Sequence, residues 1–396
     1  MNSADRQRKK MIVLGHDASR TGAPIFLLHL TEWLKRHGAI DFEIILKQGG
    51  PLLAEFQKIA PTTVLAHTRA ERLIHRCCQL LRCPTPARFS PAAKIGRRLR
   101  HRHIDLAYAN TVAVVAEAAV LMRLGVPLVW HIHELPFVIN TYDDAGQFRA
   151  AGRAARRLVA AADCVQRGLV TGYGLAPEKI SVIHEFAPPA LQPAADATAS
   201  RAAARAELNL SADTFVAGMC GTVGWRKGVD WFLAVGHRLA AEFPARNIVL
   251  VWIGDTDNET TFRQVRHEIQ QARLTERVKF IGVKADSRHY LAALDAFLLS
   301  SREDPFPLAM LEAGSLGLPV VCFADSGGGP EFVGDDAGII VPYADTAAAA
   351  AALVKLSLAP AWRQQLGATA REKVLTRYTL AIQAPKILRL LEEAAR

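Results

Sequence analysis

The hydrophobic residues of this chain form short continuous runs that alternate with amphipathic stretches. The run at 248–253 fits a strand buried on both faces, and 23–37 has the three- and four-residue apolar spacing of a helix. This alternating order predicts parallel sheets with helices on both faces, an α/β fold. We expect strands at 11–15, 42–46, 63–66, 104–109 and 128–131, and then at 215–220, 248–253, 278–281, 296–299, 320–323 and 339–341.

The two series of strands predict two Rossmann-like domains that face a central cleft. The length of 396 residues also exceeds what one core normally holds. Between the series, 187–198 is rich in proline and alanine, which is typical of a linker. We therefore expect an N-terminal domain at 1–190 and a C-terminal domain at 191–378. A closing helix at 379–396, with a helical pattern over about 380–395, could pack on its own domain or cross back to the first.

The composition fits a soluble globular protein, with 50% hydrophobic and 22% charged residues. Its apolar runs are too short to span a bilayer, and no long apolar segment follows the polar first ten residues. The six cysteines form no C-x-x-C pair, which favours reduced thiols and a cytoplasmic location.

Positive charge is concentrated in the first half of the chain. Residues 1–190 hold 26 Lys and Arg against 15 Asp and Glu, and 69–102 hold ten cations against one acid. Few aromatic residues interleave these cations, so we expect no nucleic acid partner. The segment could instead contact an anionic inner-membrane surface, or it could be an ordinary solvated face. Its helical spacing sets Arg69, Arg72 and Arg76 opposite Ile74, Cys77, Cys78 and Leu81.

Two carboxylates eight positions apart form the most informative motif. Asp304 precedes a rigid stretch at 305–307, and Glu312 lies in the first turns of the helical pattern that follows. A carboxylate and a helix N-terminus aimed at one point suit a ligand that carries both phosphate and hydroxyl groups.

A glycine-rich turn follows the strand at 215–220. In it Arg226 and Lys227 stand just before a helix, where cations oppose the helix macrodipole. A bound diphosphate would resolve that conflict, although surface cations are also common. The turn at 15–24, with Gly22 at its helix start, is interpreted either as a second phosphate contact or as an ordinary βα turn.

These motifs resemble those of the family 4 retaining glycosyltransferases, which have the GT-B fold. The resemblance rests on Asp304–Glu312 in place of E-x7-E, on Trp-Arg-Lys-Gly at 225–228 and on Ser-Gly-Gly-Gly-Pro-Glu at 326–331. It implies transfer of a sugar from a nucleotide-diphosphate sugar to a glycan or lipid-linked acceptor, in polysaccharide or glycolipid synthesis. It implies no metal and no cofactor besides the donor.

The resemblance also assigns roles to single residues. Glu312 would bind the ribose, Lys227 the pyrophosphate and Gly22 a donor phosphate, while His133 matches the histidine near the acceptor. His131 and His133 follow one strand at a spacing of two, and we expect only His133 to face the cleft. The implied catalytic residues are His133, Asp304, Arg226 and Lys227, and the implied donor-binding residues are Gly22, Gly224, Arg226, Lys227, Pro307, Leu308 and Glu312.

The chain departs from the family pattern at four places. Asp304 is one methylene shorter than the usual glutamate, and Thr222 replaces an arginine whose charge Arg226 would supply. The usual I-P-N-G turn reads Ile-His-Glu-Phe at 183–186. At 162–165 a strand start leads directly into Gln166, so about one strand's worth of residues is expected to be missing from the first sheet.

Two other functions fit the same motifs. A GT-B sugar-nucleotide epimerase would need the donor and water but no acceptor. A non-catalytic basic protein that binds membrane or nucleic acid would use residues 69–102 and leave the donor motifs without a role.

Overall fold

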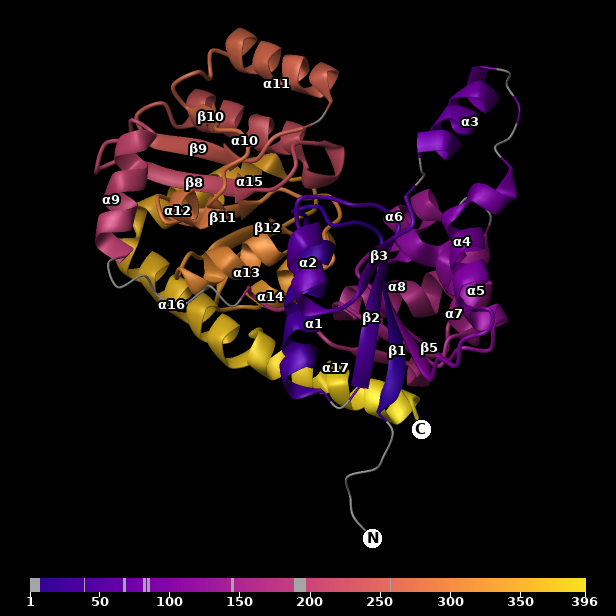
Figure 1. Ribbon diagram of the computed structural model, residues 1–396. Helices are drawn as coiled ribbons and strands as arrows, with labels where there is room; N and C mark the ends of the chain where they lie inside the picture. The colour runs from indigo at the N-terminus through magenta and orange to yellow at the C-terminus, as the bar shows by residue number, and fades with distance from the viewer. Residues whose placement is uncertain are drawn as a thin grey trace. The chain divides into compact units, whose positions relative to one another are not determined.

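A computed structural model of the protein divides into two compact units, each an α/β structure with its own sheet (Figure 1). Unit 1 comprises Met1–His184 together with Leu380–Arg396, and unit 2 comprises Glu185–Thr379. The structure describes residues 8–38, 40–66, 69–80, 83, 86–143, 146–188, 197–256 and 258–396. Most of the predicted linker at 187–198 therefore lies outside the described residues.

Within the described residues, unit 1 has a seven-stranded parallel sheet with the order β3-β2-β1-β4-β5-β6-β7. The strand order reverses between β1 and β4, as in doubly wound folds. The central strands are buried on both faces, which explains their continuous apolar sequences. The strands are β1 (Lys9–Gly15), β2 (Ile40–Leu46), β3 (Thr62–Val64), β4 (Leu106–Asn110), β5 (Leu128–Ile132), β6 (Arg157–Ala160) and β7 (Ile180–Val182).

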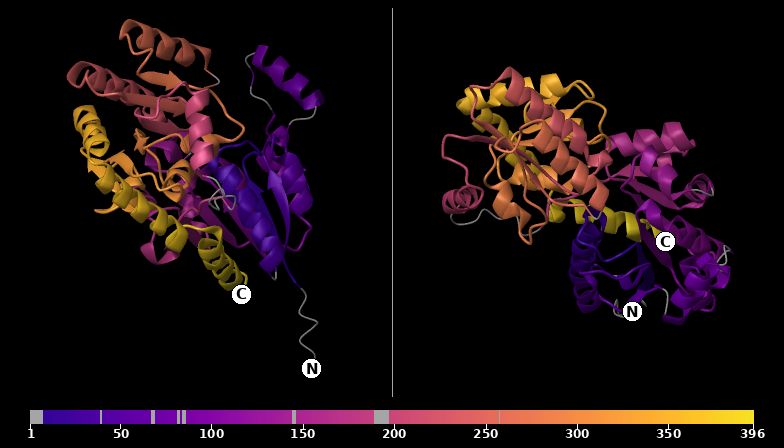
Figure 2. Two further views of the ribbon diagram at one scale, coloured as in Figure 1. Left: turned by 90° about the vertical axis from the view of Figure 1, so that its left-hand side faces the viewer. Right: turned by 90° about the horizontal axis from the view of Figure 1, so that it is seen from above.

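The helices of unit 1 come from both ends of the chain. The last of them, α17 (Leu380–Ala394), contacts α1 as well as β4 and β5 (Figure 1). By contrast, α3 (Arg69–Leu80) stands away from the sheet of its unit, as Figure 2 also shows. The other helices are α1 (Gly22–His37), α2 (Leu53–Ile59), α4 (Pro91–Leu99), α5 (Val115–Arg123), α6 (Pro136–Tyr142), α7 (Gln147–Ala154) and α8 (Asp163–Tyr173).

The prediction that the first sheet lacks a strand near residue 165 is wrong. Residues 157–160 form β6, and helix α8 begins at Asp163, directly after that strand. The sheet then continues with β7, which pairs with β6. Residues 163–165 therefore begin a helix rather than a strand, with Ala162 as the N-cap residue and Val165 on the buried face.

Unit 2 has a six-stranded parallel sheet within the described residues, with the order β10-β9-β8-β11-β12-β13. Counted from β8, this is the same doubly wound order as in unit 1. Its strands are β8 (Phe215–Cys220), β9 (Ile248–Ile253), β10 (Val278–Phe280), β11 (Ala296–Leu299), β12 (Val320–Phe323) and β13 (Gly338–Val341). Its helices are α9 (Ala197–Glu207), α10 (Val229–Glu242), α11 (Glu259–Gln271), α12 (Ser287–Leu291), α13 (Leu308–Ser315), α14 (Gly329–Val333), α15 (Thr346–Leu358) and α16 (Pro360–Arg377).

Each sheet has one switch point, where the strand order reverses and the loops after two neighbouring strands diverge. In unit 1 these are the loops after β1 and β4, and in unit 2 the loops after β8 and β11. Ligands of open α/β sheets bind outside the carboxyl ends of the strands at such points. No helix in the described ranges has both the length and the hydropathy that a bilayer span requires.

Candidate functional site

The turn after β8 carries the two predicted cations of unit 2. Arg226 and Lys227 lie in a short 3-10 helix, Trp225–Lys227, and Gly228 is the N-cap residue of α10 in the left-handed conformation, with a φ of 69°. A Cβ atom at Gly228 would lie 1.9 Å from the backbone oxygen of Ser300. Glycine is therefore required here for two reasons, its dihedral angle and its close approach to the next strand's loop.

The segment that follows β11 holds this turn through successive residues. Since β8 and β11 flank the switch point of unit 2, the two loops meet there. The contacts are Ser300 Oγ to Lys227 O at 2.9 Å, Arg302 N to Arg226 O at 2.9 Å, Arg226 Nη1 to Glu303 O at 3.2 Å, and an ion pair between Lys227 Nζ and Asp304 Oδ2.

Asp304 is a buried carboxylate, with only 4% of its surface exposed. It accepts a hydrogen bond from Ser301 Oγ at 2.9 Å, pairs with Lys227, and lies 3.8 Å from Arg226 Nη1. Burial by itself would raise the pKa of Asp304, but the charges of Lys227 and Arg226 outweigh it and lower the pKa. The carboxylate thus neutralises one of the two cations that oppose the macrodipole of α10.

The loop after Asp304 leads into α13. Pro307 is the N-cap residue, Leu308 is the first helical residue, and Glu312 follows in the second turn. No hydrogen bond or ion pair of the Glu312 side chain is present among the described residues. Burial raises the pKa of Glu312 to about 7; Arg288 opposes this effect and Asp286 adds to it. A partly buried carboxylate without a partner can accept hydrogen bonds from a ligand's hydroxyl groups.

Cys220, at the end of β8, lies near both Lys227 of the turn and Glu312 of α13. Burial and, to a smaller extent, the Glu312 carboxylate raise the pKa of its thiol to about 12, against the opposing charge of Lys227. Both charged groups therefore lie near the same strand end. The structure thus brings together Arg226, Lys227, Asp304 and Glu312, with Gly224 in the same turn, all within unit 2.

The remaining predicted residues, Gly22 and His133, lie in unit 1. Gly22 is the first residue of α1, and His133 directly follows β5. Asn110, the last residue of β4, connects these two elements. Its Oδ1 lies 2.7 Å from His133 Nε2, and its Nδ2 donates to the backbone oxygen of Ala23 at 3.0 Å. The switch point of unit 1 therefore joins a ring nitrogen of His133 to the start of α1.

The expectation that the spacing puts His131 and His133 on different faces is wrong, whereas the expected packed position of His131 agrees with its full burial. The rings of His131 and His133 stack with their centroids 4.1 Å apart, and both meet Phe26 edge-on at 5.0 Å. Residues two apart on a strand point to the same face, so the spacing itself requires this arrangement. The two differ in depth: His131 is fully buried and hydrogen-bonded to Tyr108, whereas His133 is 7% exposed.

Glu134 organises the backbone beside His133. Its carboxylate accepts hydrogen bonds from the hydroxyl of Thr111 and from the backbone nitrogens of Val112 and His133. Thr111 has a φ of 84°, a conformation that a β-branched residue rarely adopts. Such strain costs on the order of 1–3 kcal/mol and is typical of functional sites. Glu134 is thus a structural acid that stabilises the strained end of β4.

Loops after β1 and β2 add charged groups to the same edge of unit 1. Burial lowers the pKa of His16, and His133 and Lys47 lower it further, while Asp17 and Glu134 oppose this change. Lys47 also donates to the backbone oxygen of Ala113 at 2.6 Å. The carboxyl ends of β1, β2, β4 and β5 therefore converge on a mixed-charge surface around His133.

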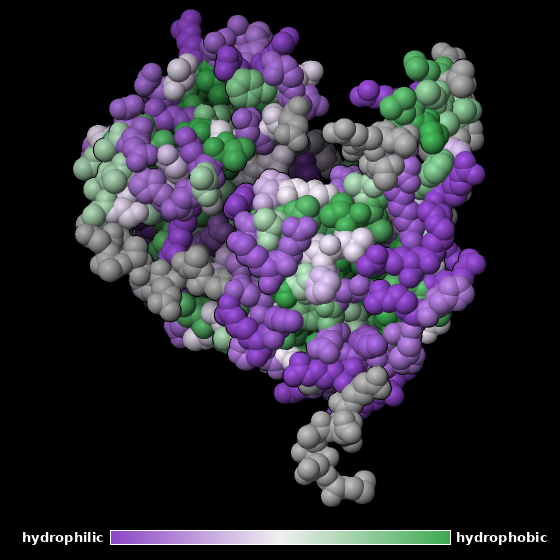
Figure 3. Space-filling view, viewed as in Figure 1, coloured by the Kyte–Doolittle hydropathy of each residue, from purple (hydrophilic) through white to green (hydrophobic). Residues whose placement is uncertain are grey.

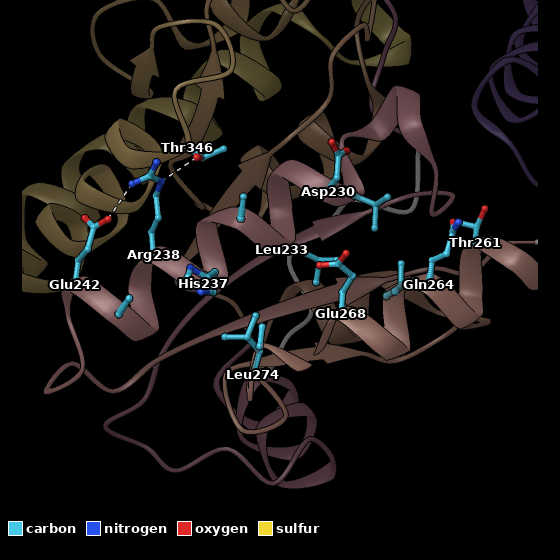
Figure 4. Close-up of a pocket in the computed structure, with 15 residues that line it drawn as sticks. Asp230, Leu233, His237, Arg238, Glu242, Thr261, Gln264, Glu268, Leu274 and Thr346 are labelled. Atoms are coloured by element: carbon cyan, nitrogen blue, oxygen red, sulfur yellow. Dashed lines mark hydrogen bonds and ion pairs between the residues drawn. The ribbon is translucent and has the colours of Figure 1, made fainter. Parts of the chain in front are cut away.

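A separate cavity of about 750 Å³ lies between α10 and α11 in unit 2 (Figure 4). It shares Asp230 with the first turn of α10 but contains none of the predicted site residues. Arg238 at its edge is held by Thr346 and Glu242. Among the described residues, no group of three or more His, Cys, Asp and Glu side chains is arranged to hold a metal ion.

Family models match both parts of the chain that carry these features. The model described as Glycosyltransferase Family 4 matches residues 18–190, and the one described as Glycosyl transferases group 1 matches residues 214–358. The chain belongs to family 4 of the glycosyltransferases. The resemblance inferred from the motifs at 225–228 and 304–312 is confirmed.

Named relatives agree with this family. The chain is similar to the D-inositol 3-phosphate glycosyltransferase of Saccharomonospora viridis, with 30% identity over 267 residues, 63% of this chain and 61% of that protein. It is also similar to the lipopolysaccharide core biosynthesis glycosyltransferase LpsD of Rhizobium meliloti, with 29% identity over 178 residues, 44% of this chain and 49% of that protein. The chain therefore matches about half to three fifths of the length of these relatives.

A solved structure of Anabaena HepE in complex with UDP-glucose has the same fold. Its TM-score is 0.80 at 20% identity, and the match covers 97% of this chain and 99% of that one. The predicted GT-B fold is confirmed by this likeness.

In this family 4 glycosyltransferase, several residues of the candidate site were not predicted from the sequence motifs. Asn110 contacts His133, and Ser300 and Arg302 contact the 225–228 turn. None of the three belongs to the motifs quoted above, although Ser300 and Arg302 lie close to Asp304 in the sequence. For Ser300 and Arg302, the signal in the sequence was the run of polar residues at 300–304 directly after a buried strand.

Proposed function

We propose that the protein is a retaining glycosyltransferase that moves a sugar from a nucleotide-diphosphate sugar to a glycan or lipid-linked acceptor. The observation that carries this proposal is the group of charged residues at the switch point of unit 2. There the Arg226–Lys227 turn faces the buried Asp304, and Glu312 offers a carboxylate that has no hydrogen bond or ion pair to any residue the structure describes. The same edge of the sheet thus carries two cations that can bind a diphosphate and a carboxylate that can accept hydrogen bonds from ribose hydroxyl groups.

Unit 2 holds the donor in this proposal. Lys227 and Arg226 neutralise the diphosphate, and the backbone of the turn at Gly224 approaches it. A Cβ at Gly224 would meet no atom within 4 Å, so this glycine leaves open space in front of the turn. The N-terminus of α13, at Pro307 and Leu308, adds favourable dipole charge, and Glu312 accepts hydrogen bonds from the ribose.

The sugar is transferred by substitution at its anomeric carbon. The bond from this carbon to the diphosphate oxygen breaks while the bond to the acceptor oxygen forms on the same face, which retains the configuration. The leaving phosphate accepts the acceptor's proton, and Lys227 and Arg226 stabilise the charge that develops on it. Asp304 orients Lys227 for this role through their ion pair.

Unit 1 binds the acceptor in this proposal, and His133 is the residue that positions it. The hydrogen bond to Asn110 and the stack on His131 fix the orientation of the His133 ring. A fixed ring at the strained end of β4 is suited to orienting a hydroxyl group.

Donor binding is the first step to test. Wild-type protein is screened with UDP-, GDP- and ADP-sugars by thermal shift, by hydrolysis and by product analysis with and without acceptor glycans. Glu312→Ala and Lys227→Ala should each abolish the donor response, whereas Glu372→Ala and Lys355→Ala, which change exposed residues elsewhere in unit 2, should retain it. If the first two variants respond like wild type, the site assignment is wrong. Conversion of the donor to an epimer without any acceptor would instead identify an epimerase.

We further propose a cytoplasmic role in surface polysaccharide or glycolipid assembly, at the inner membrane surface. The names of the two relatives, which refer to an inositol phosphate and to the lipopolysaccharide core, support this context. Helix α3 adds a physical argument, because it exposes Leu73 and Leu80 (66% and 84%) as well as Arg76. Figure 3 shows hydrophobic surface on this projecting helix. The side chains of Arg69 and Arg72, and all of Leu81, lie outside the described residues.

Membrane binding is tested by flotation with vesicles of phosphatidylglycerol or of phosphatidylcholine alone. We expect salt-sensitive binding to the anionic vesicles that a Leu73→Glu/Leu80→Glu variant loses. Leu358→Glu, at an exposed leucine of α15, is the matched control. Equal binding to both vesicle types, or none, contradicts this part of the proposal.

A further inference from the structure

Arg302 occupies an unusual position beside the 225–228 turn. Only 11% of its side chain is exposed, and its guanidinium lies over two tryptophan rings, at 4.1 Å from the Trp231 centroid and 5.1 Å from that of Trp225. Both terminal nitrogens of the guanidinium donate to the carboxylate of Asp230. Nη1 also donates to the backbone oxygen of Trp225 at 2.7 Å.

These contacts connect three elements. Trp225 belongs to the turn, Asp230 to the first turn of α10, and Arg302 to the loop after β11. The backbone nitrogen of Arg302 also donates to Arg226 O at 2.9 Å, so main chain and side chain hold the same turn. Arg302 therefore fixes the turn at two successive carbonyl groups, those of Trp225 and Arg226.

Trp231 of this cluster also contacts two further aromatic rings. Trp231 packs edge-on against Phe323 at 5.0 Å and Tyr343 at 5.1 Å, which come from β12 and from the loop after β13. Burial would raise the pKa of Asp230, but the hydrogen bonds and charge of Arg302 outweigh it and lower the pKa. Asp230 thus stays ionised and also complements the N-terminal dipole of α10.

A planar, forked cation is needed for this set of contacts. A guanidinium can stack on indole rings while it donates two parallel hydrogen bonds in its own plane. A lysine ammonium is a point charge on a flexible stem and cannot satisfy both the carboxylate and the carbonyl in fixed directions. The position is therefore specific for arginine, not only for positive charge.

We propose that Arg302 is a positioning residue, which holds the Trp225–Lys227 turn in the shape that binds the donor diphosphate. This inference rests on the proposed function, because it needs a phosphate ligand at that turn. Arg302 acts through Arg226 and Lys227 and touches no reacting atom. Without it, the amide groups of the turn lose their fixed arrangement while the strands around them remain intact.

The test compares Arg302→Met, Arg302→Lys and Asp230→Asn with wild type by two readouts. The first is hydrogen exchange of the Lys227 and Gly228 amides, which donate to the carbonyls of Gly224 and Trp225. The second is affinity for UDP, GDP and ADP by calorimetry. Arg238→Met is the control, because Arg238 lies on α10 and also bonds a carboxylate but does not contact the turn.

We expect faster exchange of the two amides in Arg302→Met and about a 10- to 100-fold weaker affinity for the preferred nucleoside diphosphate, the range for losing a charged bidentate hydrogen bond. Arg302→Lys should recover part of both effects. Asp230→Asn, which keeps the stacked guanidinium, should weaken affinity by about 3- to 10-fold and is the milder variant if Arg302→Met does not fold.

Three outcomes overturn the inference alone, and the first two are unchanged exchange of the turn in all three variants and faster exchange with unchanged nucleotide affinity. In either case wild type still binds a nucleoside diphosphate, and the proposed function stands. If wild type binds none of the three nucleotides, the proposed function fails and the inference fails with it. Arg302→Lys equal to wild type in both readouts would also overturn the inference, because charge alone would then be sufficient.

Discussion

Glu312 is a partly buried carboxylate with no hydrogen bond or ion pair within the part of the chain that the structure describes. Burial raises its pKa to about 7 from an ordinary value of 4.5. Near neutral pH the group is therefore poised between its two protonation states, which is costly for the folded protein but useful for a ligand. Hydroxyl groups that donate to the ionised form would supply the partners that the protein itself omits.

The first prediction concerns this carboxylate and the pH dependence of stability. Because the folded protein binds the proton more tightly than the unfolded chain, the contribution of Glu312 favours folding below about pH 4.5 and is lost as pH rises through 7. Glu312→Gln cannot ionise, so it should match wild type near pH 4.5 and exceed it at pH 8. We expect a gain on the order of 1–2 kcal/mol in the free energy of unfolding after allowing for partial exposure.

Urea unfolding at pH 4.5, 7 and 8 measures this difference, with Glu372→Gln on the exposed side of α16 as control. A constant difference between Glu312→Gln and wild type at all three values would show that the carboxylate does not titrate in this range. The variant should also lose donor binding, so that stability and binding change in opposite directions.

At the scale of elements, the 225–228 turn depends on two glycines for different reasons. Gly228 has a left-handed φ of 69° and lies against the Ser300 carbonyl, so its role is internal to the fold. Gly224 has an extended φ of 179°, which any residue can adopt, and a Cβ there would enter open space. Gly228 is thus required by the fold, whereas Gly224 leaves space on the side where the ligand is proposed to bind.

The second prediction compares Gly228→Ala with Gly224→Ala. The left-handed conformation alone costs about 1–2 kcal/mol for alanine, and the contact with Ser300 O forces a backbone shift that adds to this cost. We expect Gly228→Ala to lower the free energy of unfolding by at least about 2 kcal/mol, and Gly224→Ala to change it by less than about 0.5 kcal/mol. In the proposed function, Gly224→Ala weakens donor binding without loss of stability.

Urea unfolding and nucleotide titration of the two variants separate these roles. Equal stabilities would mean that the turn relaxes at little cost. Full donor affinity in Gly224→Ala would mean that no ligand approaches that side of the turn.

At the scale of the whole molecule, unit 1 is built from two distant parts of the chain. Helix α17 begins at Leu380 and packs on α1, β4 and β5. Its Ile387 and Leu391 are completely buried. The core of unit 1 is therefore complete only when the last residues of the chain are present, although unit 2 lies between them in sequence.

The third prediction follows from this arrangement. Leu391→Ala should lower the stability of unit 1 by about 2–5 kcal/mol, the usual cost of a cavity in a packed core. Hydrogen exchange followed by mass spectrometry should show faster exchange in β4 and β5 and unchanged exchange in β8 and β9. Leu375→Ala, at a leucine of α16 that is 47% exposed, is the control and should change neither unit. Uniform loss of protection in both units would contradict the separate folding of unit 1.

Local patterns were sufficient to predict most strands. The predicted segments 215–220, 248–253, 296–299 and 320–323 coincide with β8, β9, β11 and β12, because a strand buried on both faces must be apolar throughout. The pattern failed at β6, which begins with Arg157, and at the short β7, because neither carries a long apolar run. The start of α8 at Asp163 was predicted to be a strand because its first apolar residues show no clear helical period.

The sequence by itself determined the two βα series, the family motifs and the kinds of side chain available for a donor. Only the tertiary structure decided which of these groups are partners. Lys227 and Asp304 are 77 positions apart, and they meet because β8 and β11 are neighbours in the sheet. Arg302 likewise finds Asp230 and two tryptophans only across that junction. Hydrophobic periodicity records which face of an element is buried, but the order of strands, and therefore the contacts between their loops, is decided when the sheet assembles.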